Sequence, residues 1–113
     1  MTLDEALKLE AGPELDALVA REVMKWRIDW AKDNDKFNPL HWRPSTDGNA
    51  MLEVAQKLNA GGWTIGLQWE EDDKRTYASV ENDQSVFWGE AGAVEMPLAL
   101  CRAAIMACWE GKK

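Results

Sequence analysis

The chain has 113 residues, the size of one domain, and 13 basic against 20 acidic side chains give it a formal net charge of −7. This acidic balance argues against duplex nucleic acid as a partner, because phosphate binding relies on a basic face. No apolar run approaches the roughly 18 residues of a membrane span, and the acidic start of the chain lacks the features of a signal peptide. Seven tryptophans are the most unusual feature of the composition. Each buries a large flat surface and suits cores, interfaces and stacking pockets alike.

Two helices are predicted in the first part of the chain. Thr2 to Glu10 indicates a short helix, because Thr2 and Glu5 have the spacing of a capping box. Pro13 suits the first turn of a second helix, which runs to Trp30 with one apolar stripe at helical spacing. A weaker stripe on its far side predicts that this helix is either sandwiched or shared with another subunit; it consists of Ala17, Ala20, Met24 and Ile28.

Residues 31–43 form an irregular connection, after which Pro44 to Asp47 indicates the start of a third helix. Ser45 or Thr46 can accept from its unpaired N–H groups, and Asp47 favours its positive end. The glycine pair 61–62 ends this helix.

From Trp63 the apolar period changes from 3.6 to 2, which indicates strands. Short polar turns separate them, so they form an antiparallel meander. The predicted strands are Trp63 to Trp69, Arg75 to Glu81 and Gln84 to Trp88.

The last predicted helix, Leu98 to Trp109 with Pro97 in its first turn, is almost wholly apolar. Such a helix needs apolar neighbours nearly all round. The residues expected to face the sheet are Leu98, Cys101, Ile105, Cys108 and Trp109. Arg102 is its only charge, and we expect an internal carboxylate as its partner rather than a ligand.

Three stretches resemble one family. They are residues 15–26 (LDALVAREVMKW), residues 42–47 running on to 53–58 (WRPSTD and EVAQKL), and residues 97–104 (PLALCRAA). Together they are similar to the phage ABA sandwich domain family, small proteins of tailed bacteriophages and prophages, over about residues 15 to 107. The resemblance implies an α-β-α sandwich, and it implies no biochemical role. Together with the missing membrane span and signal peptide, a phage origin predicts the host cytoplasm as the location. Lys25 departs from the family, in which Gly often precedes the Trp.

The expected fold class is therefore α/β (α+β): a three-layer α-β-α sandwich around a small antiparallel sheet of three or four strands. We expect one domain over residues 1–113, with 1–12 as an N-terminal helical extension and 13–110 as the sandwich.

The residues that carry catalysis in other proteins are sparse. His41 is the only histidine, and no nucleophile motif or Gly-rich phosphate loop is present. Cys101 and Cys108 lie seven apart on one helix, too far for a disulfide, and are expected in the core. Residues 70–73 (EEDD) indicate a solvated hairpin tip rather than a cation loop. We therefore expect no enzyme, no metal and no cofactor.

The strongest candidate site is the corner from Trp42 to Asp47. A helix N-terminus suits a phosphate or carboxylate, Arg43 adds a planar fork, and Trp42 or Phe37 offers a stacking surface. Alternatively, Ser45, Thr46 and Asp47 simply cap their own helix. Both interpretations stay open from the sequence.

Apolar surface exceeds what three strands can cover, which predicts a homodimer or higher oligomer. The expected interface residues are Met24, Ile28, Leu100 and Met106; alternatively, the N-terminal helix folds over this surface. The resulting hypothesis is a phage- or prophage-encoded, non-enzymatic accessory protein that captures a small anionic ligand, such as a nucleotide signal of host defence. The alternative is an adaptor that docks on a host or phage protein through exposed Trp and Met side chains.

Overall fold

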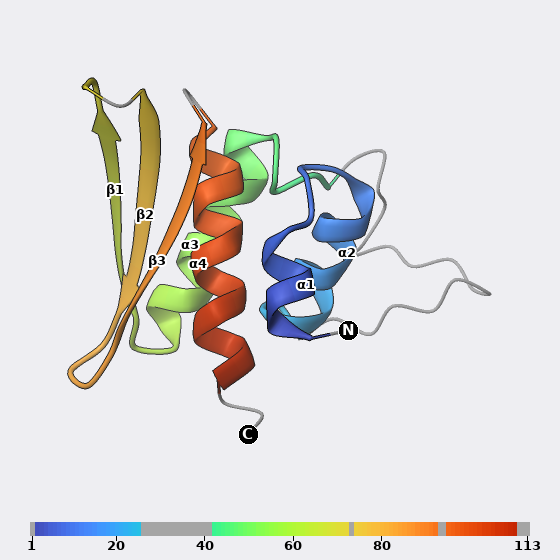
Figure 1. The fold of residues 1–113 in the computed structure, drawn as a ribbon. Coiled ribbons are helices and arrows are strands. Elements are labelled where there is room, and N and C mark those ends of the chain that lie inside the picture. The colour runs from blue at the N-terminus through green and yellow to red at the C-terminus, as the bar shows by residue number, and fades with distance from the viewer. Residues whose placement is uncertain (1, 26–41, 73, 93–94, 111–113) are drawn as a thin grey trace.

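The computed structural model of the chain describes residues 2–25, 42–72, 74–92 and 95–110. Its elements follow the predicted order of two helices, a third helix, three strands and a last helix (Figure 1). They are α1 (Leu3–Leu7), α2 (Pro13–Glu22), α3 (Gly48–Ala60), β1 (Thr64–Glu70), β2 (Arg75–Glu81), β3 (Val86–Gly92) and α4 (Met96–Glu110).

The three strands form one antiparallel sheet in the order β1-β2-β3, with Leu67 opposite Ala78 and Ala78 opposite Gly89. α3 and α4 pack against the strands, and α1 and α2 pack on α4 from the other side (Figure 1). The predicted α+β class with a three-stranded antiparallel sheet packed against helices is confirmed. In the described part of the chain, the helices form two layers on one face of the sheet.

α4 is the central element of this stack, which explains why its sequence is apolar on every side. One side of it meets the sheet, and the other sides meet the remaining three helices. Its buried residues are each exposed by 5% or less: Leu98, Ala99, Leu100, Cys101, Ala103, Ala104, Ile105 and Ala107.

The contact between α4 and β3 is made through very small residues. A Cβ atom placed on Gly89 would overlap the backbone of Ala99 and Ala103, so helix and strand meet backbone to backbone. The expectation that Cys101 and Cys108 face the sheet is wrong, because Cys101 lies near Asp16 and Cys108 near Glu22, both on α2. The alanine face of α4 lies there instead, because only small side chains permit this approach.

We expect Gly89→Ala to destabilise the protein by about 3 kcal/mol, because a methyl group here must push the backbone of α4 away from the sheet. Urea denaturation followed by circular dichroism measures this change. Gly48→Ala is the matched control: nothing lies near its Cβ position, so it should be neutral or stabilise by less than about 1 kcal/mol. Equal effects of the two substitutions would contradict the close approach.

β3 begins and ends later than the pattern predicts, at Val86–Gly92 rather than Gln84 to Trp88. The cause is the turn before it, where the Asn82 carboxamide oxygen accepts from the backbone N–H groups of Gln84 (2.9 Å) and Ser85 (2.8 Å). Gln84 and Ser85, which the sequence pattern assigned to the strand, therefore belong to this Asx turn. The segment up to Gly92, expected to lead into the last helix, is strand instead.

α2 ends at Glu22, with Val23 as its C-cap, whereas the pattern predicts a helix to Trp30. Lys25 follows in the left-handed region at φ 61°, a conformation that glycine adopts without strain. This backbone geometry suits the Gly that the family resemblance implies at this position. Trp26, Ile28 and Trp30 lie outside the described residues.

Lys25→Gly should therefore stabilise the protein by about 0.5–1 kcal/mol, since relief of left-handed strain exceeds the added backbone entropy of the unfolded chain. Thermal and urea unfolding measure the gain. Lys25→Ala removes the same side chain without relieving the strain and should show no gain. A gain of the same size in both variants would assign the effect to the lysine side chain and not to the backbone.

Candidate functional site

The predicted corner is a tight turn that delivers the chain into α3. The carbonyl oxygen of Arg43 accepts from the N–H groups of Thr46 (3.1 Å) and Asp47 (2.7 Å). Asp47 is the N-cap of α3, and its carboxylate accepts from the N–H of Asn49 at 3.1 Å. Of the residues expected at this helix start, Asp47 therefore acts as the cap.

Ser45 has a different task, because it connects the turn to α2. It is only 3% exposed; its hydroxyl accepts from the N–H of Gly12 (3.0 Å), and its own N–H donates to Asp16 Oδ1 (2.9 Å). These two bonds join segments that lie about thirty residues apart in the chain, so the corner holds α2 against α3.

Asp16 is the buried acid of this connection, at 1% exposure. Burial raises its pKa above the ordinary value of 3.8, although hydrogen bonds from Ser45 and the charge of Arg43 oppose the rise. Its second oxygen, Oδ2, has no hydrogen-bond partner among the described residues. The sequence analysis did not single out Asp16. The available signal was its position directly after Leu15, a residue of the predicted apolar stripe.

Because the folded-state pKa of Asp16 is raised, its favourable contribution to stability is present below about pH 4 and is lost as the pH rises through that pKa. Asp16→Asn keeps the acceptor for Ser45 but cannot ionise. Its stability relative to the parent should therefore increase between about pH 3.5 and about pH 7 in urea titrations. Asp83→Asn, in an exposed turn, is the control. A constant or falling difference would contradict the buried-acid assignment.

Trp42 lies inside the protein at 7% exposure, and its indole Nε1 donates to Glu53 Oε2 on α3 at 3.2 Å. Its ring therefore packs in the core beside α3. Arg43 and Thr46 are exposed at the same corner, whereas Phe37 and His41 lie outside the described residues. The structure thus brings together five of the six predicted ligand residues, and anion binding at this corner stays a prediction.

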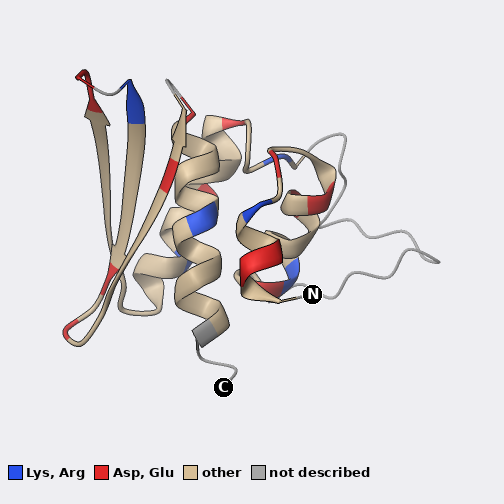
Figure 2. Ribbon diagram, viewed as in Figure 1, with Lys and Arg blue, Asp and Glu red and all other residues tan. Residues whose placement is uncertain are grey.

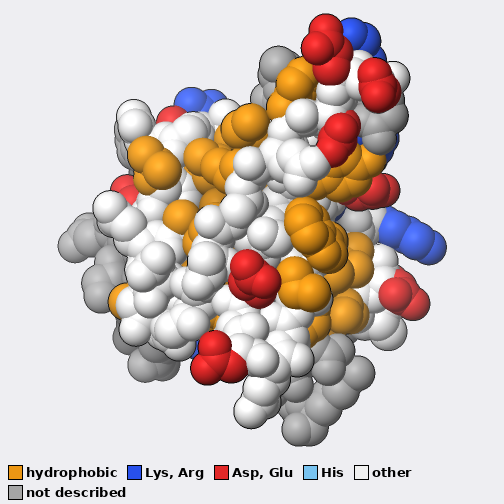
Figure 3. All heavy atoms as spheres, turned by 90° about the vertical axis from the view of Figure 1, so that its left-hand side faces the viewer, with side chains coloured by type: hydrophobic (Ala, Val, Ile, Leu, Met, Phe, Trp, Pro, Cys, Tyr) orange, Lys and Arg blue, Asp and Glu red, His pale blue; other side chains and the backbone are white. Residues whose placement is uncertain are grey.

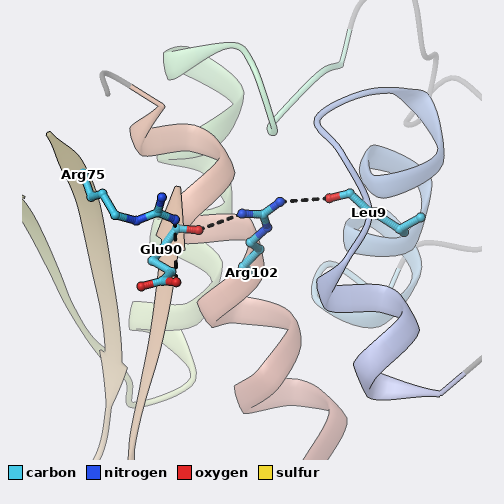
Figure 4. A network of polar contacts seen from close by, with 4 residues as sticks. All are labelled: Leu9, Arg75, Glu90 and Arg102. Carbon is cyan, nitrogen blue, oxygen red and sulfur yellow. Dashed lines mark hydrogen bonds and ion pairs between the residues drawn. The ribbon is translucent and has the colours of Figure 1, made fainter. Parts of the chain in front are cut away.

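Arg102 of α4 lies between β3 and the segment after α1 (Figure 4). Its guanidinium donates from Nη1 to the carbonyl oxygen of Glu90 on β3 (2.8 Å) and from Nη2 to that of Leu9, after α1 (3.2 Å). The carboxylate of Glu90 instead pairs with Arg75 at 3.6 Å. The expected carboxylate partner of Arg102 was therefore wrong: two main-chain carbonyls take that place.

Charge is sparse around this central helix, as Figure 2 shows by the single basic band on α4. Acidic residues gather at the strand turns instead, at Glu70, Glu71 and Asp72 between β1 and β2 and at Glu81 and Asp83 between β2 and β3. The interior of the sheet and its helix-facing side are left to apolar and small residues.

Several large hydrophobic side chains are exposed on the two edge strands and on α3. Figure 3 views the molecule from the left of Figure 1, where the sheet lies, and shows hydrophobic side chains interspersed with acidic ones. At the β1 edge of the sheet, α3 and β1 form a groove of about 390 Å³ that is lined in part by Leu52, Ala55 and Ile65. The exposed fractions are 54% for Leu52, 42% for Leu67, 39% for Trp69, 48% for Val86 and 53% for Trp88.

The predicted interface residues fall in different places. Leu100 is 1% exposed and enclosed by the protomer, and Ile28 lies outside the described residues. Met24 and Met106 are partly exposed. Oligomerisation through these residues stays a prediction.

Within the described ranges, no group of three His, Cys, Asp or Glu side chains could hold a metal ion. None of the described helices is long and apolar enough to cross a membrane. Cys101 is buried without a disulfide, and burial together with the nearby charge of Asp16 raises the pKa of its thiol. This placement confirms the expectation that it serves as a small core residue.

One family model matches most of the chain. The model of the phage ABA sandwich domain matches residues 17–105. The fold is also similar to that of a phage protein from Bacillus cereus ATCC 14579, with a TM-score of 0.63 and 16% sequence identity over 87% of this chain and 92% of that chain. No curated protein matches the sequence.

Proposed function

Because the chain belongs to the phage ABA sandwich domain family, we propose that it is a non-enzymatic phage accessory protein that acts by binding another protein. The observation that supports this proposal is the exposed apolar surface formed by Leu52, Ile65, Leu67 and Trp69, the α3–β1 surface. Its residues come from two neighbouring elements that pack on each other.

β1 has a single strand neighbour, β2, so its other edge presents unpaired backbone N–H and C=O groups in the described part of the chain. Such an edge is a template for an added strand. Most proteins protect it with lysine, proline or a bulge, but β1 (TIGLQWE) carries no basic residue and no proline.

Side chains on β1 alternate in a way that suits strand addition. Ile65, Leu67 and Trp69 share the face that α3 covers only in part, since their cross-strand partners on β2 are the buried residues of the helix-facing side. A partner strand with apolar side chains at alternate positions can place them over the groove between α3 and β1. The acidic turn at Glu70–Asp72 favours a basic residue beside that strand.

The small-ligand form of the hypothesis has weaker geometric support. Arg43 and Thr46 are exposed beside the start of α3, but Trp42 and Ser45 are buried and Asp47 already caps the helix. A nucleotide titration of tryptophan fluorescence, repeated with Arg43→Ala, tests this form separately. A titration that Arg43→Ala abolishes would favour ligand capture over the adaptor.

Site-specific photocrosslinking in infected cells tests the protein-binding proposal. A photoreactive phenylalanine at Leu67 should capture one discrete partner, and the same probe at Val86 should not. Both side chains are exposed to a similar degree (42% and 48%), but they lie on opposite edges of the sheet. Leu67→Lys, which introduces an edge charge, should reduce capture by a probe at Trp69 by at least about tenfold.

Equal capture from both edges, or capture unaffected by Leu67→Lys, would refute the assignment. A captured second copy of this chain would refute the adaptor role and assign the α3–β1 surface to self-association instead. Circular dichroism of Leu67→Lys and Val86→Lys should show unchanged folds, because both positions are exposed.

A further inference from the structure

The strand register defines an open face of the sheet, which no described helix covers (Figure 1). A Cβ atom on Gly89 would point into α4, so Gly89 and its partner Ala78 face the helices. Because side chains alternate along a strand, Trp88 and its partner Ser79 project from the open face. Gly66 pairs with Ser79 on β1, and a Cβ atom on it would meet the Ser79 side chain, so it shares this face. One row of the open face therefore runs from Gly66 through Ser79 to Trp88.

Side chains in this row increase in size from β1 to β3. Gly66 has no side chain and Ser79 a short one, whereas the indole of Trp88 is 53% exposed. Ser79 is only 8% exposed although no described helix covers it, so large side chains of the open face surround it. Its neighbours there are Trp88 across the strand and Tyr77 and Glu81 along β2. Ser79 thus has two aromatic residues and a carboxylate on three sides and only a glycine on the β1 side.

The carboxylate beside Ser79 favours a cation at this position. Glu81 is exposed at the end of β2, and neither ion pair found among the described residues includes it. Glu90, the other acid next to Trp88, already pairs with Arg75 at 3.6 Å (Figure 4). A cation above Ser79 would meet the Glu81 carboxylate and an indole together, and a guanidinium binds both kinds of group.

We propose, on the basis of the proposed strand addition to β1, that the added strand carries an arginine opposite Gly66. The guanidinium of this arginine lies above Ser79, against the indole of Trp88 and beside the carboxylate of Glu81. A side chain opposite Gly66 projects from the open face, because paired residues share one face of a sheet. Two strand spacings, about 10 Å, separate the added strand from β2. The long stem of an arginine crosses most of this distance over Gly66, where no side chain obstructs it, and the indole approaches from β3.

This geometry specifies the chemistry of the partner strand. Apolar side chains lie opposite Ile65 and Leu67, on the helix-facing side, and the arginine lies between them on the open face. A second copy of this chain does not fit this role through its own β1, because that strand (TIGLQWE) has no basic residue. The partner is therefore a different protein with a basic residue between two apolar ones.

Titration with strand peptides, followed by NMR of the isotope-labelled protein, tests this inference. The probe is acetyl-Thr-Val-Arg-Val-Thr-amide, whose symmetric pattern places the arginine between two valines in either strand direction. Its counterpart carries citrulline, which has nearly the shape of arginine without the charge. The arginine peptide should bind with a Kd below about 1 mM, and the citrulline peptide at least about threefold more weakly. The indole N–H signal of Trp88, assigned by its loss in Trp88→Leu, should shift with the arginine peptide.

Substitutions on the open face separate the contacts of the guanidinium. Glu81→Gln should weaken the arginine peptide at least about threefold and leave the citrulline peptide unchanged. Asp83→Asn is the matched control, because it removes one charge from the exposed turn beyond β2 and should change neither peptide. Trp88→Leu should weaken the arginine peptide at least about threefold but leave a norleucine peptide, which lacks the head group, unchanged.

Failure of this inference is distinguishable from failure of the proposed function. Where the arginine and citrulline peptides bind equally and Leu67→Lys weakens both, strand addition stands and the arginine is overturned. Equal effects of Glu81→Gln and Asp83→Asn also overturn it, since they indicate attraction to overall charge. Where no peptide binds below about 1 mM, the inference is overturned, and photocrosslinking at Leu67 judges the proposed function independently.

Discussion

The packing of α4 against β3 at Gly89 is the constraint on which the rest of the structure depends. Helix and strand approach so closely that only glycine and alanine fit between them, at Gly89, Ala99 and Ala103. This approach lets one helix contact the sheet on one side and three helices on the others. Since a three-stranded sheet is too small to bury a core alone, α4 provides the second surface that both layers share.

The same contact explains why a charged residue is tolerated on an apolar helix. Arg102 extends from the rim of the α4–β3 contact, where its Cβ lies beside Gly89, and reaches carbonyl groups on β3 and after α1. One side chain thus joins three segments, because Arg102 of α4 donates both to β3 and to the segment after α1. A lysine could not serve two acceptors in one plane, because its ammonium lacks the guanidinium fork.

Periodicity predicted most of the elements, because their apolar faces are continuous in sequence. β2 lies at the predicted residues, Arg75–Glu81, and α4 differs by one or two residues at each end. The failures have physical causes that a local pattern does not carry. The Ser45–Asp16 bond spans 29 residues, and the acceptors of Arg102 are main-chain carbonyls, which every residue possesses. The end of α2 depends on backbone conformation at Lys25, a position where only the resemblance to relatives gave a signal.

Buried and exposed tryptophans have different roles in this small protein, and the exposed ones indicate where it can meet other molecules. The indole of Trp42 is buried in the core and donates a hydrogen bond to Glu53. Trp42 therefore offers no open stacking surface at the corner where the sequence predicted one. Trp69 and Trp88 remain exposed, and they lie on the two edge strands, β1 and β3. A sheet of three strands has proportionally more edge than a larger one, and edges combine unpaired backbone with reachable side chains. Each exposed indole therefore lies where a binding partner can combine backbone pairing with an aromatic contact, which a tryptophan on the middle strand could not offer.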